Sequence, residues 1–322
     1  MKIGVIGAGG WGARVISEYT QLKKERKIDQ LYVFDVDIGR ANSHKDSAKF
    51  IVCESMEEML KNVDGVHICA PDKYHYDLAK QSMEHGRHVL IEKPFVTNMR
   101  DAQRLAKMAK ERRLVLEVGH LYRFANALKK AAELYRKGYF GKVYYINFYW
   151  THIFNNPVHP DVMWDLMPHL IDMYNMITGE WPKKFAGFAL PMRRQEHSEV
   201  TFIEARTRNG PVSTYHVSWL SPIRKREIEI VGSKRSAHID AVEQTIKVFA
   251  EGGKNTEVRV RKNNTIREEE LNFISSIRQG KAKVNTVELG IRNVDTILQI
   301  QYAFRHYTMH LIKNITRDLL GR

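Results

Sequence analysis

Cysteine is scarce in this sequence: Cys53 and Cys69 are the only two among 322 residues. Two cysteines provide neither a disulfide framework nor the four-ligand pattern of a structural zinc site. Cys69 stands in the apolar run GVHICA, where a small core residue is the simplest interpretation. We therefore expect a fold held together by its hydrophobic core, and an intracellular location.

Long apolar runs are absent as well, since no stretch reaches the roughly 18 residues that a membrane-spanning helix requires. The N-terminal MKIGVIGAGG has one lysine and too much glycine for a secretory signal. Hydrophobic residues make up 43% and charged residues 27% of the chain, as is typical of soluble globular proteins. The sequence predicts a cytoplasmic protein, long enough for two domains and without a membrane partner.

Acidic residues are outnumbered: 37 Asp and Glu stand against 51 Lys and Arg, a formal net charge of +14. This excess favours an anionic small substrate or a nucleic acid, although a solubility preference of the host explains it equally. Acidic residues interrupt most basic clusters, and the sequence contains no zinc finger, RNA-binding signature or basic tail. We expect a small, anionic substrate and no nucleic-acid partner.

A glycine pattern opens the chain. The apolar run KIGVI leads into GAGGWG and then into the helical pattern ARVISEYTQLKKE. Gly7 permits a tight turn, Gly9 lets a pyrophosphate approach the backbone, and Gly12 lets helix and strand pack closely. The helix N-terminus offers free N–H groups to the phosphates. The residues predicted to bind a dinucleotide here are Gly7, Gly9, Gly10, Trp11 and Gly12.

An acidic residue follows at the end of the next strand-like run, QLYVFDVD. Asp35 comes 23 positions after Gly12, where a carboxylate is expected to accept hydrogen bonds from the adenosine ribose hydroxyls. The same charge would repel a 2′-phosphate, so NAD is favoured over NADP. Asp37 is a weaker candidate on the same face, and a turn aspartate at a strand end is the alternative interpretation of Asp35.

Strand-like and helical stretches alternate through the first 120 residues. The runs KFIVC, GVHIC, HVLIE and LVLEV are separated by helical patterns at residues 55–62, 73–86 and 98–112. This alternation predicts a doubly wound parallel sheet with helices on both faces, ending near residue 121. Ligands of such sheets bind at the carboxyl ends of the strands.

Two polar groups follow such strand ends. APDKYH comes after GVHIC, and His75 there is either a cofactor contact or a capped surface residue. EKPF comes after HVLI, where the nicotinamide is expected; the lysine precedes proline, so it is held out of helical conformation and its bond can be cis. A surface lysine in a crossover loop is the alternative. The predicted cofactor contacts are Ala70, Pro71, His75, Glu92 and Lys93.

The stretch DVMWDLMPHLIDMY is apolar except for four polar residues, spaced three or four positions apart. Asp161, Asp165, His169 and Asp172 therefore fall on one side of a helix. Ionisable groups are costly to bury unless they are paired, so this face is either solvated or a site.

Taken together, GAGGWG, Asp35, APDKYH, EKP and WDLMPH resemble the glucose–fructose oxidoreductase / inositol dehydrogenase / MocA family of NAD(P)-dependent sugar oxidoreductases. Their order and spacing cover nearly the whole chain, and the combination is more specific than any single part. The resemblance implies a Rossmann domain over residues 1–120. It implies a second α/β domain, with a large, mostly antiparallel open sheet, over residues 121–322.

The resemblance also implies a catalytic set: Lys93 from EKP, with Asp165 and His169 four residues apart. His169 has a suitable pKa to act as the base, Asp165 would orient it, and Lys93 would hold the substrate oxygen. One departure from the family is Pro168, which stands where a small residue is common. Because proline fits the first turn of a helix, we expect the helix to begin near residue 166 or 167.

Other substrate contacts are expected around the start of the second domain. His120, Tyr122 and Arg123 in VGHLYRF should line the cleft, where Arg123 is either a clamp for an anionic or hydroxyl-rich substrate or part of a structural ion pair. Asp161 and His169 complete the predicted substrate set. The aromatic strand pattern KVYYINFYWTHIF needs covering, so a homodimer or homotetramer is expected.

The stretches SWLSPIRKREIEIVG and VGHLYRF resemble family members that oxidise nucleotide sugars. The resemblance implies oxidation of the 3-hydroxyl of a UDP-linked N-acetylhexosamine, or its uronic acid, to a ketone. The alternatives are a free or phosphorylated hexose or an inositol as substrate, and a non-enzymatic NAD-binding regulator. A zinc or manganese site is a further alternative, with His152, His159, Asp161, Asp165 and His169 as its ligands. No metal site is expected, because the predicted cofactor site around Lys93 already explains two of these residues.

Overall fold

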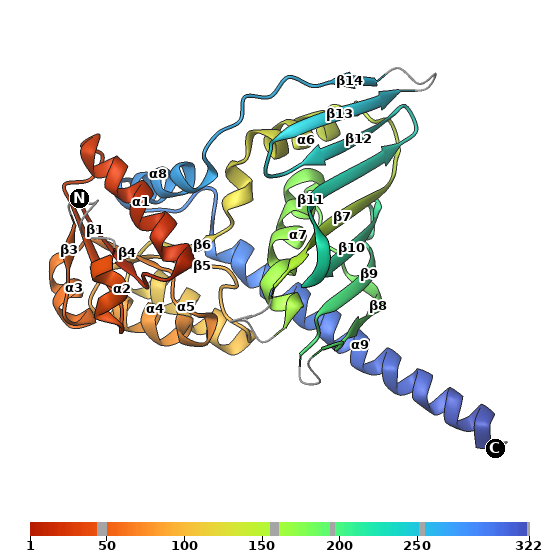
Figure 1. Cartoon of the computed structure of the whole chain (residues 1–322), viewed down its shortest axis with the longest axis horizontal. Helices are drawn as coiled ribbons and strands as arrows, with labels where there is room; N and C mark the ends of the chain where they lie inside the picture. The colour runs from red at the N-terminus through yellow and green to blue at the C-terminus, as the bar shows by residue number, and fades with distance from the viewer. Residues whose placement is uncertain (44–49, 155–160, 194–196, 251–254, 321–322) are drawn as a thin grey trace. The chain divides into compact units, whose positions relative to one another are not determined.

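The computed structural model describes residues 1–43, 50–154, 161–193, 197–250 and 255–320, and for residues 305–320 the backbone alone. The chain forms two compact units, whose elements are labelled in Figure 1. The first unit comprises Met1–Phe124 and Asn264–Val294, and the second comprises Ala125–Asn263 and Asp295–Arg322.

The first unit contains a parallel sheet with the strand order β3-β2-β1-β4-β5-β6. The chain moves outward from β1 in one direction and then in the other, so the predicted doubly wound sheet is confirmed. The strands are β1 (Lys2–Ile6), β2 (Gln30–Phe34), β3 (Ile51–Val52), β4 (Gly65–Ile68), β5 (His88–Glu92) and β6 (Leu116–Gly119). The connecting helices are α1 (Gly10–Lys24), α2 (Ile38–Ser43), α3 (Met56–Asn62), α4 (His75–Glu84) and α5 (Met99–Glu111).

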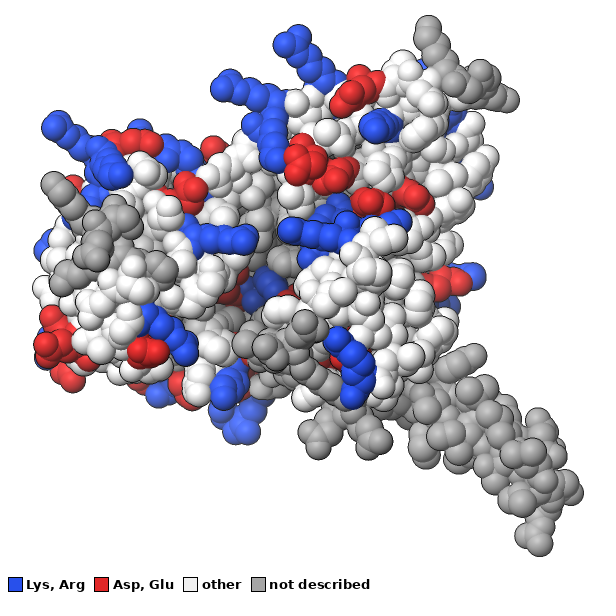
Figure 2. Space-filling view, viewed as in Figure 1, with Lys and Arg blue, Asp and Glu red and all other residues white. Residues whose placement is uncertain are grey.

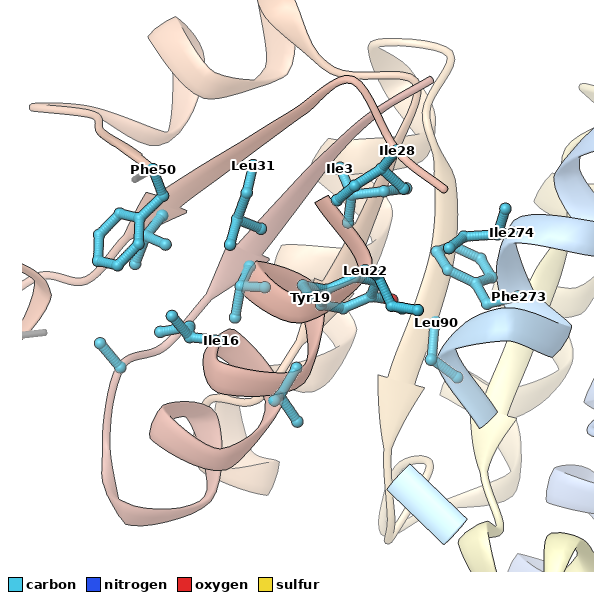
Figure 3. Packing of buried hydrophobic residues seen from close by; sticks show 14 of the residues in the cluster. Ile3, Ile16, Tyr19, Leu22, Ile28, Leu31, Phe50, Leu90, Phe273 and Ile274 are labelled. Carbon is cyan, nitrogen blue, oxygen red and sulfur yellow. The ribbon is translucent and has the colours of Figure 1, made fainter. Parts of the chain in front are cut away.

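A helix from near the end of the sequence belongs to this first unit. Helix α8 (Thr265–Gln279) begins at Asn264, whose side chain accepts a hydrogen bond from the backbone of Arg267. Its residues Phe273 and Ile274 lie in the same buried cluster as residues of α1 and β1 (Figure 3). The predicted second domain, residues 121–322, includes residues 264–294. Their apolar face packs instead against the first unit.

Buried carboxyl groups lie between α8 and the sheet. Glu117 on β6 is fully buried and accepts a hydrogen bond from Asn272 Nδ2 at 2.9 Å. Burial raises the pKa of Glu117 to about 7, although hydrogen bonds from Ser276 and Asn272 oppose the rise. Glu270 is also fully buried, and burial raises its pKa well above the ordinary value. The first unit therefore stabilises the protonated form of these carboxyls.

The second unit contains a mostly antiparallel sheet, as predicted, in which β7 and β10 form the parallel pair among the described strands. The strand order is β14-β13-β12-β11-β7-β10-β9-β8. The first four strands in the sequence are β7 (Val143–Ile153), β8 (Lys184–Leu190), β9 (Val200–Arg206) and β10 (Val212–Ser218). The remaining strands are β11 (Leu220–Gly232), β12 (Arg235–Asp240), β13 (Thr245–Ala250) and β14 (Asn255–Glu257). Helices α6 (Asn126–Arg136) and α7 (Val162–Thr178) pack against each other, and α9 (Val287–Leu320) ends the described chain.

Helix α7 begins earlier than predicted. The Asp161 side chain accepts a hydrogen bond from the Trp164 backbone N–H at 2.9 Å, which caps the helix and starts it at Val162. Pro168 therefore lies inside α7, and the expected start near residue 166 or 167 is wrong. Proline in a helix interior lacks the N–H that would bond to the residue four positions earlier. The helix tolerates this cost because it is buried on nearly every side.

Among the residues that the structure describes, no helix is both long and apolar enough to cross a membrane.

The raised pKa of Glu117 leads to a pH-dependent prediction. Because the folded chain binds this proton more tightly than the unfolded chain, stability falls as the pH rises through the ordinary glutamate value towards 7. Glu117→Gln removes that loss. We expect it to raise the free energy of unfolding at pH 8 by up to about 3 kcal/mol, and to change it little below pH 5.

Urea unfolding of the wild type and Glu117→Gln at both pH values measures this difference. Glu111→Gln is the matched control, because Glu111 is exposed at the end of α5. A Glu117→Gln effect that is the same at pH 5 and pH 8 would contradict the prediction.

Candidate active site

The glycine loop between β1 and α1 lies directly against the end of β4. Gly7 has a φ of +99°, and a Cβ there would come 2.9 Å from the backbone nitrogen of Ala70. A Cβ on Gly12 would lie 2.0 Å from the carbonyl oxygen of Gly7. In the described chain, nothing lies within 4 Å of where a Cβ would stand on Gly9 or Gly10. This open backbone at the start of α1 fits the approach of a pyrophosphate.

Asp35 connects the end of β2 to the glycine loop. Its carboxylate is buried, and it accepts hydrogen bonds from the backbone N–H of Ala8 at 2.7 Å and of Asp37 at 2.8 Å. These bonds fix the carboxylate beside the loop, which is a suitable place for a ribose partner. Asp37 is exposed instead and lies 3.2 Å from the guanidinium of Arg40. The arrangement favours Asp35 over Asp37 as the ribose ligand.

His75 stands at the start of α4 and is only 1% exposed. Its Nδ1 lies 2.8 Å from the carbonyl oxygen of Pro94, and its Nε2 lies 2.8 Å from that of Ala70. The alternative of a surface histidine is therefore wrong. A polar contact of this ring with the cofactor stays a prediction, and in the structure both ring nitrogens lie against backbone carbonyls.

Glu92 ends β5 and is nearly buried. Its Oε1 accepts a hydrogen bond from Trp11 Nε1 at 2.5 Å and lies 3.3 Å from His67 Nε2. Burial by itself raises the pKa of Glu92, but the contacts with His67, Trp11 and Lys93 outweigh it and lower that pKa. A charged Glu92 therefore ties the glycine loop to β5. His67 is not among the residues predicted from the sequence, although a polar residue inside the apolar run GVHIC is a signal.

His67, Cys69 and Glu92 present three possible metal ligands within 4.8 Å of one another. The carboxylate, however, already accepts a hydrogen bond from Trp11, and burial raises the pKa of the Cys69 thiol well above its ordinary value. A thiol must lose its proton to bind a metal ion. We therefore interpret this group as a buried contact between His67 and Glu92 with a partly buried, protonated thiol nearby.

Lys93 directly follows β5, and the Lys93–Pro94 peptide bond is cis. Parallel strands end at the same edge of a sheet, so Lys93 shares this edge with Ala70 after β4 and with the glycine loop after β1. Tyr122 and Arg123 belong to the same unit and lie, partly exposed, in the short helix η2 (Leu121–Phe124).

In the second unit, Asp165 and His169 lie on α7 and are each 8% exposed. Trp219, which directly precedes β11, donates its indole N–H to Asp165 Oδ2 at 2.9 Å. The His169 ring lies 5.6 Å from the ring of Trp150, between centroids. Neither tryptophan is among the residues predicted from the sequence. Trp150 has a local signal in strand alternation, which places it on the same side of β7 as Phe148 and Ile146, the buried side.

The remaining predicted residues have structural contacts of their own. Asp161 caps α7, and its second carboxylate oxygen lies 3.4 Å from Gln301 Nε2. Burial raises its pKa, against the bonds that it accepts from the helix backbone. Asp172 is buried one turn beyond His169. Of the alternative metal ligands, His152 lies 3.0 Å from Arg226, and His159 falls outside the described residues.

Two family models match this chain. Residues 1–120 match the oxidoreductase family with an NAD-binding Rossmann fold, and residues 128–238 match the GFO/IDH/MocA C-terminal domain. Together they span more than half of the chain, so the chain belongs to the GFO/IDH/MocA family of oxidoreductases. It is a dehydrogenase that acts on CH–OH groups. The predicted family, fold class and enzyme class are confirmed.

Among the relatives, UDP-N-acetylglucosamine 3-dehydrogenase from Acidithiobacillus ferrooxidans is 29% identical over 254 residues, 78% of each chain. Its solved structure superposes with a TM-score of 0.83, covering 95% of this chain and 98% of the other. Glucose-6-phosphate 3-dehydrogenase from Bacillus subtilis is 24% identical over 185 residues, 53% of this chain and 52% of the other. Levoglucosan dehydrogenase, solved with NADH and levoglucosan, has a TM-score of 0.82 at 15% identity over 95% and 97% of the chains, a likeness of fold alone.

Proposed function

We propose that this protein is an NAD-dependent dehydrogenase that oxidises the 3-hydroxyl of a UDP-linked N-acetylhexosamine, or of its uronic acid, to a ketone. The observation that carries the proposal is the likeness to UDP-N-acetylglucosamine 3-dehydrogenase along 78% of both chains. The net charge of +14 supports a substrate with a diphosphate group. Figure 2 shows Lys and Arg side chains spread over the displayed face, with Asp and Glu side chains among them.

We infer that Lys93, Asp165 and His169 perform the chemistry. His169 removes the hydroxyl proton, and Lys93 binds the substrate oxygen and stabilises its negative charge as the proton leaves. Asp165 is held by the indole of Trp219 and pairs with the imidazolium that His169 becomes. When bound, NAD accepts the hydride from the carbon that carried the hydroxyl.

The cofactor and the substrate each have a proposed set of ligands. Asp35 would hold the adenosine ribose, and the open backbone of Gly9 and Gly10 would hold the pyrophosphate, so we expect NAD to be preferred over NADP. Arg123 binds an anionic group of the substrate, because a guanidinium forms paired hydrogen bonds with phosphate or carboxylate oxygens. Tyr122 and Asp161 complete the proposed substrate contacts.

We also propose that the protein is a homodimer or homotetramer assembled through the sheet of the second unit. Phe188, Phe202, His216 and Tyr149 are register partners across β8, β9, β10 and β7, so their side chains form one row. Phe188 is 48% and Phe202 40% exposed, and the rings of Phe202 and His216 stack at 4.4 Å. A continuous aromatic row of this kind is typical of a surface that a partner covers.

The substrate proposal is tested by a panel assayed at 340 nm. UDP-N-acetylhexosamines and their uronic acids are compared with glucose 6-phosphate, free hexoses and inositols, each with NAD and with NADP. We expect the highest kcat/KM for a UDP-N-acetylhexosamine or its uronic acid with NAD. A higher kcat/KM for a free or phosphorylated hexose, or for an inositol, would replace the proposed substrate with that alternative.

The catalytic roles predict that Lys93→Met and His169→Ala each abolish turnover, with a loss of at least about 100-fold in kcat. NADH affinity should change by less than about threefold, because neither change removes the glycine loop or Asp35. Lys107→Met and His85→Ala are the matched controls, since both residues are exposed on the helices of the first unit. Wild-type kcat in either active-site variant would refute that residue's assignment.

The assembly proposal predicts a dimeric or tetrameric mass by light scattering at micromolar concentration. Phe202→Glu should lower that mass, because it places a charge in the centre of the aromatic row. Lys107→Glu introduces the same charge on an exposed helix and should leave the mass unchanged. A monomeric wild type would contradict the proposal.

A further inference from the structure

The side chain of His75 joins two segments that both border the proposed cofactor site. Nε2 lies 2.8 Å from the carbonyl oxygen of Ala70, which follows β4. Nδ1 lies 2.8 Å from the carbonyl oxygen of Pro94, and 3.3 Å from that of Phe95, after β5. The ring is 1% exposed, so water does not compete for these contacts.

Each end of this bridge is close to a part of the site. Ala70 lies against the glycine loop, and a Cβ on Gly7 would come 2.9 Å from the backbone nitrogen of Ala70. Pro94 directly follows Lys93 in the chain. The same ring therefore contacts the segment that supports the glycine loop and the segment that carries the proposed catalytic lysine.

An imidazole suits this place for a geometric reason. Its two nitrogens lie on opposite sides of a rigid ring, and a carbonyl group only accepts hydrogen bonds. A neutral ring donates from one nitrogen and an imidazolium from both. In either state the ring fills the space between the two carbonyl groups and fixes how far apart the segments lie.

We propose that His75 is a positioning residue of the dehydrogenase. Its contact with Pro94 fixes the position of Lys93, and its contact with Ala70 fixes the position of the glycine loop. The first half rests on the proposed role of Lys93, and the second rests on the binding of the dinucleotide alone. Cofactor affinity and the placement of the lysine are then governed by two separable contacts of one side chain.

Two substitutions separate the contacts. In His75→Asn the amide nitrogen takes the place of Nδ1 and keeps a donor for Pro94. In His75→Gln the amide nitrogen takes the place of Nε2 and keeps a donor for Ala70. His75→Ala removes both contacts. His85→Asn and His85→Gln are the controls, because His85 is exposed at the other end of α4.

The readouts are the Kd of NADH, from NADH fluorescence, and the rate at which formaldehyde and borohydride methylate Lys93, from peptide mass spectrometry. Neither needs a sugar substrate. We expect His75→Asn, which loses the contact with Ala70, to weaken NADH binding by about three- to tenfold, with an unchanged Lys93 rate. His75→Gln should change the Lys93 rate by a similar factor and leave the Kd of NADH unchanged. His75→Ala should show both effects.

The same variants are then assayed for kcat and KM with the substrate that the panel identifies. His75→Gln should lower kcat, and His75→Asn should raise the KM for NAD. Identical behaviour of the Asn and Gln variants in both binding and labelling would overturn the proposal, as would wild-type values in His75→Ala. If His75→Gln changes only the Lys93 labelling rate and His75→Asn changes only the Kd of NADH, the positioning role stands. An unchanged kcat in His75→Gln would then refute the catalytic role of Lys93.

Discussion

The close approach of two backbone segments, at Gly12 and Gly7, is the constraint on which the cofactor edge of the first unit depends. A side chain at Gly12 would begin 2.0 Å from the carbonyl oxygen of Gly7 and push α1 away from β1. Because α1 packs this closely, its N-terminal N–H groups, the carboxylate of Asp35 and the ends of β4 and β5 gather at one edge of the sheet. Polar residues placed after those strands then become neighbours, although they are far apart in the sequence.

Both units hold a buried carboxylate with an indole N–H. Trp11 donates to Glu92 in the first unit, and Trp219 donates to Asp165 in the second. An indole is a donor without charge, so it satisfies a carboxylate oxygen and leaves the negative charge in place. A lysine or arginine at these positions would also donate a hydrogen bond, but its positive charge would neutralise the charge of the carboxylate. Tryptophan thus satisfies one oxygen of each buried carboxyl group without placing a second charge beside it.

The sequence was informative where one local pattern determines the structure. The strand–glycine–helix succession and the strand-end position of Asp35 each depend on neighbouring residues, and the structure contains both as expected. The start of α7 was misjudged because an aspartate cap, at Asp161, outweighed the preference of Pro168 for a first turn. The partners of Asp165 and His75 and the place of α8 depend on contacts between distant segments. Such contacts leave no local pattern, so sequence reasoning could not supply them.

The place of α8 has a consequence for how the chain is made. Phe273 and Ile274 fill part of the hydrophobic core that β1, β2 and α1 begin. A ribosome releases those two residues only after it has synthesised Ala125–Asn263, which form most of the second unit. The hydrophobic core of the first unit is therefore incomplete, with apolar surface exposed, until most of the second unit has been synthesised. The two units therefore finish close together in synthesis, the first at Val294 and the second with the segment that begins at Asp295.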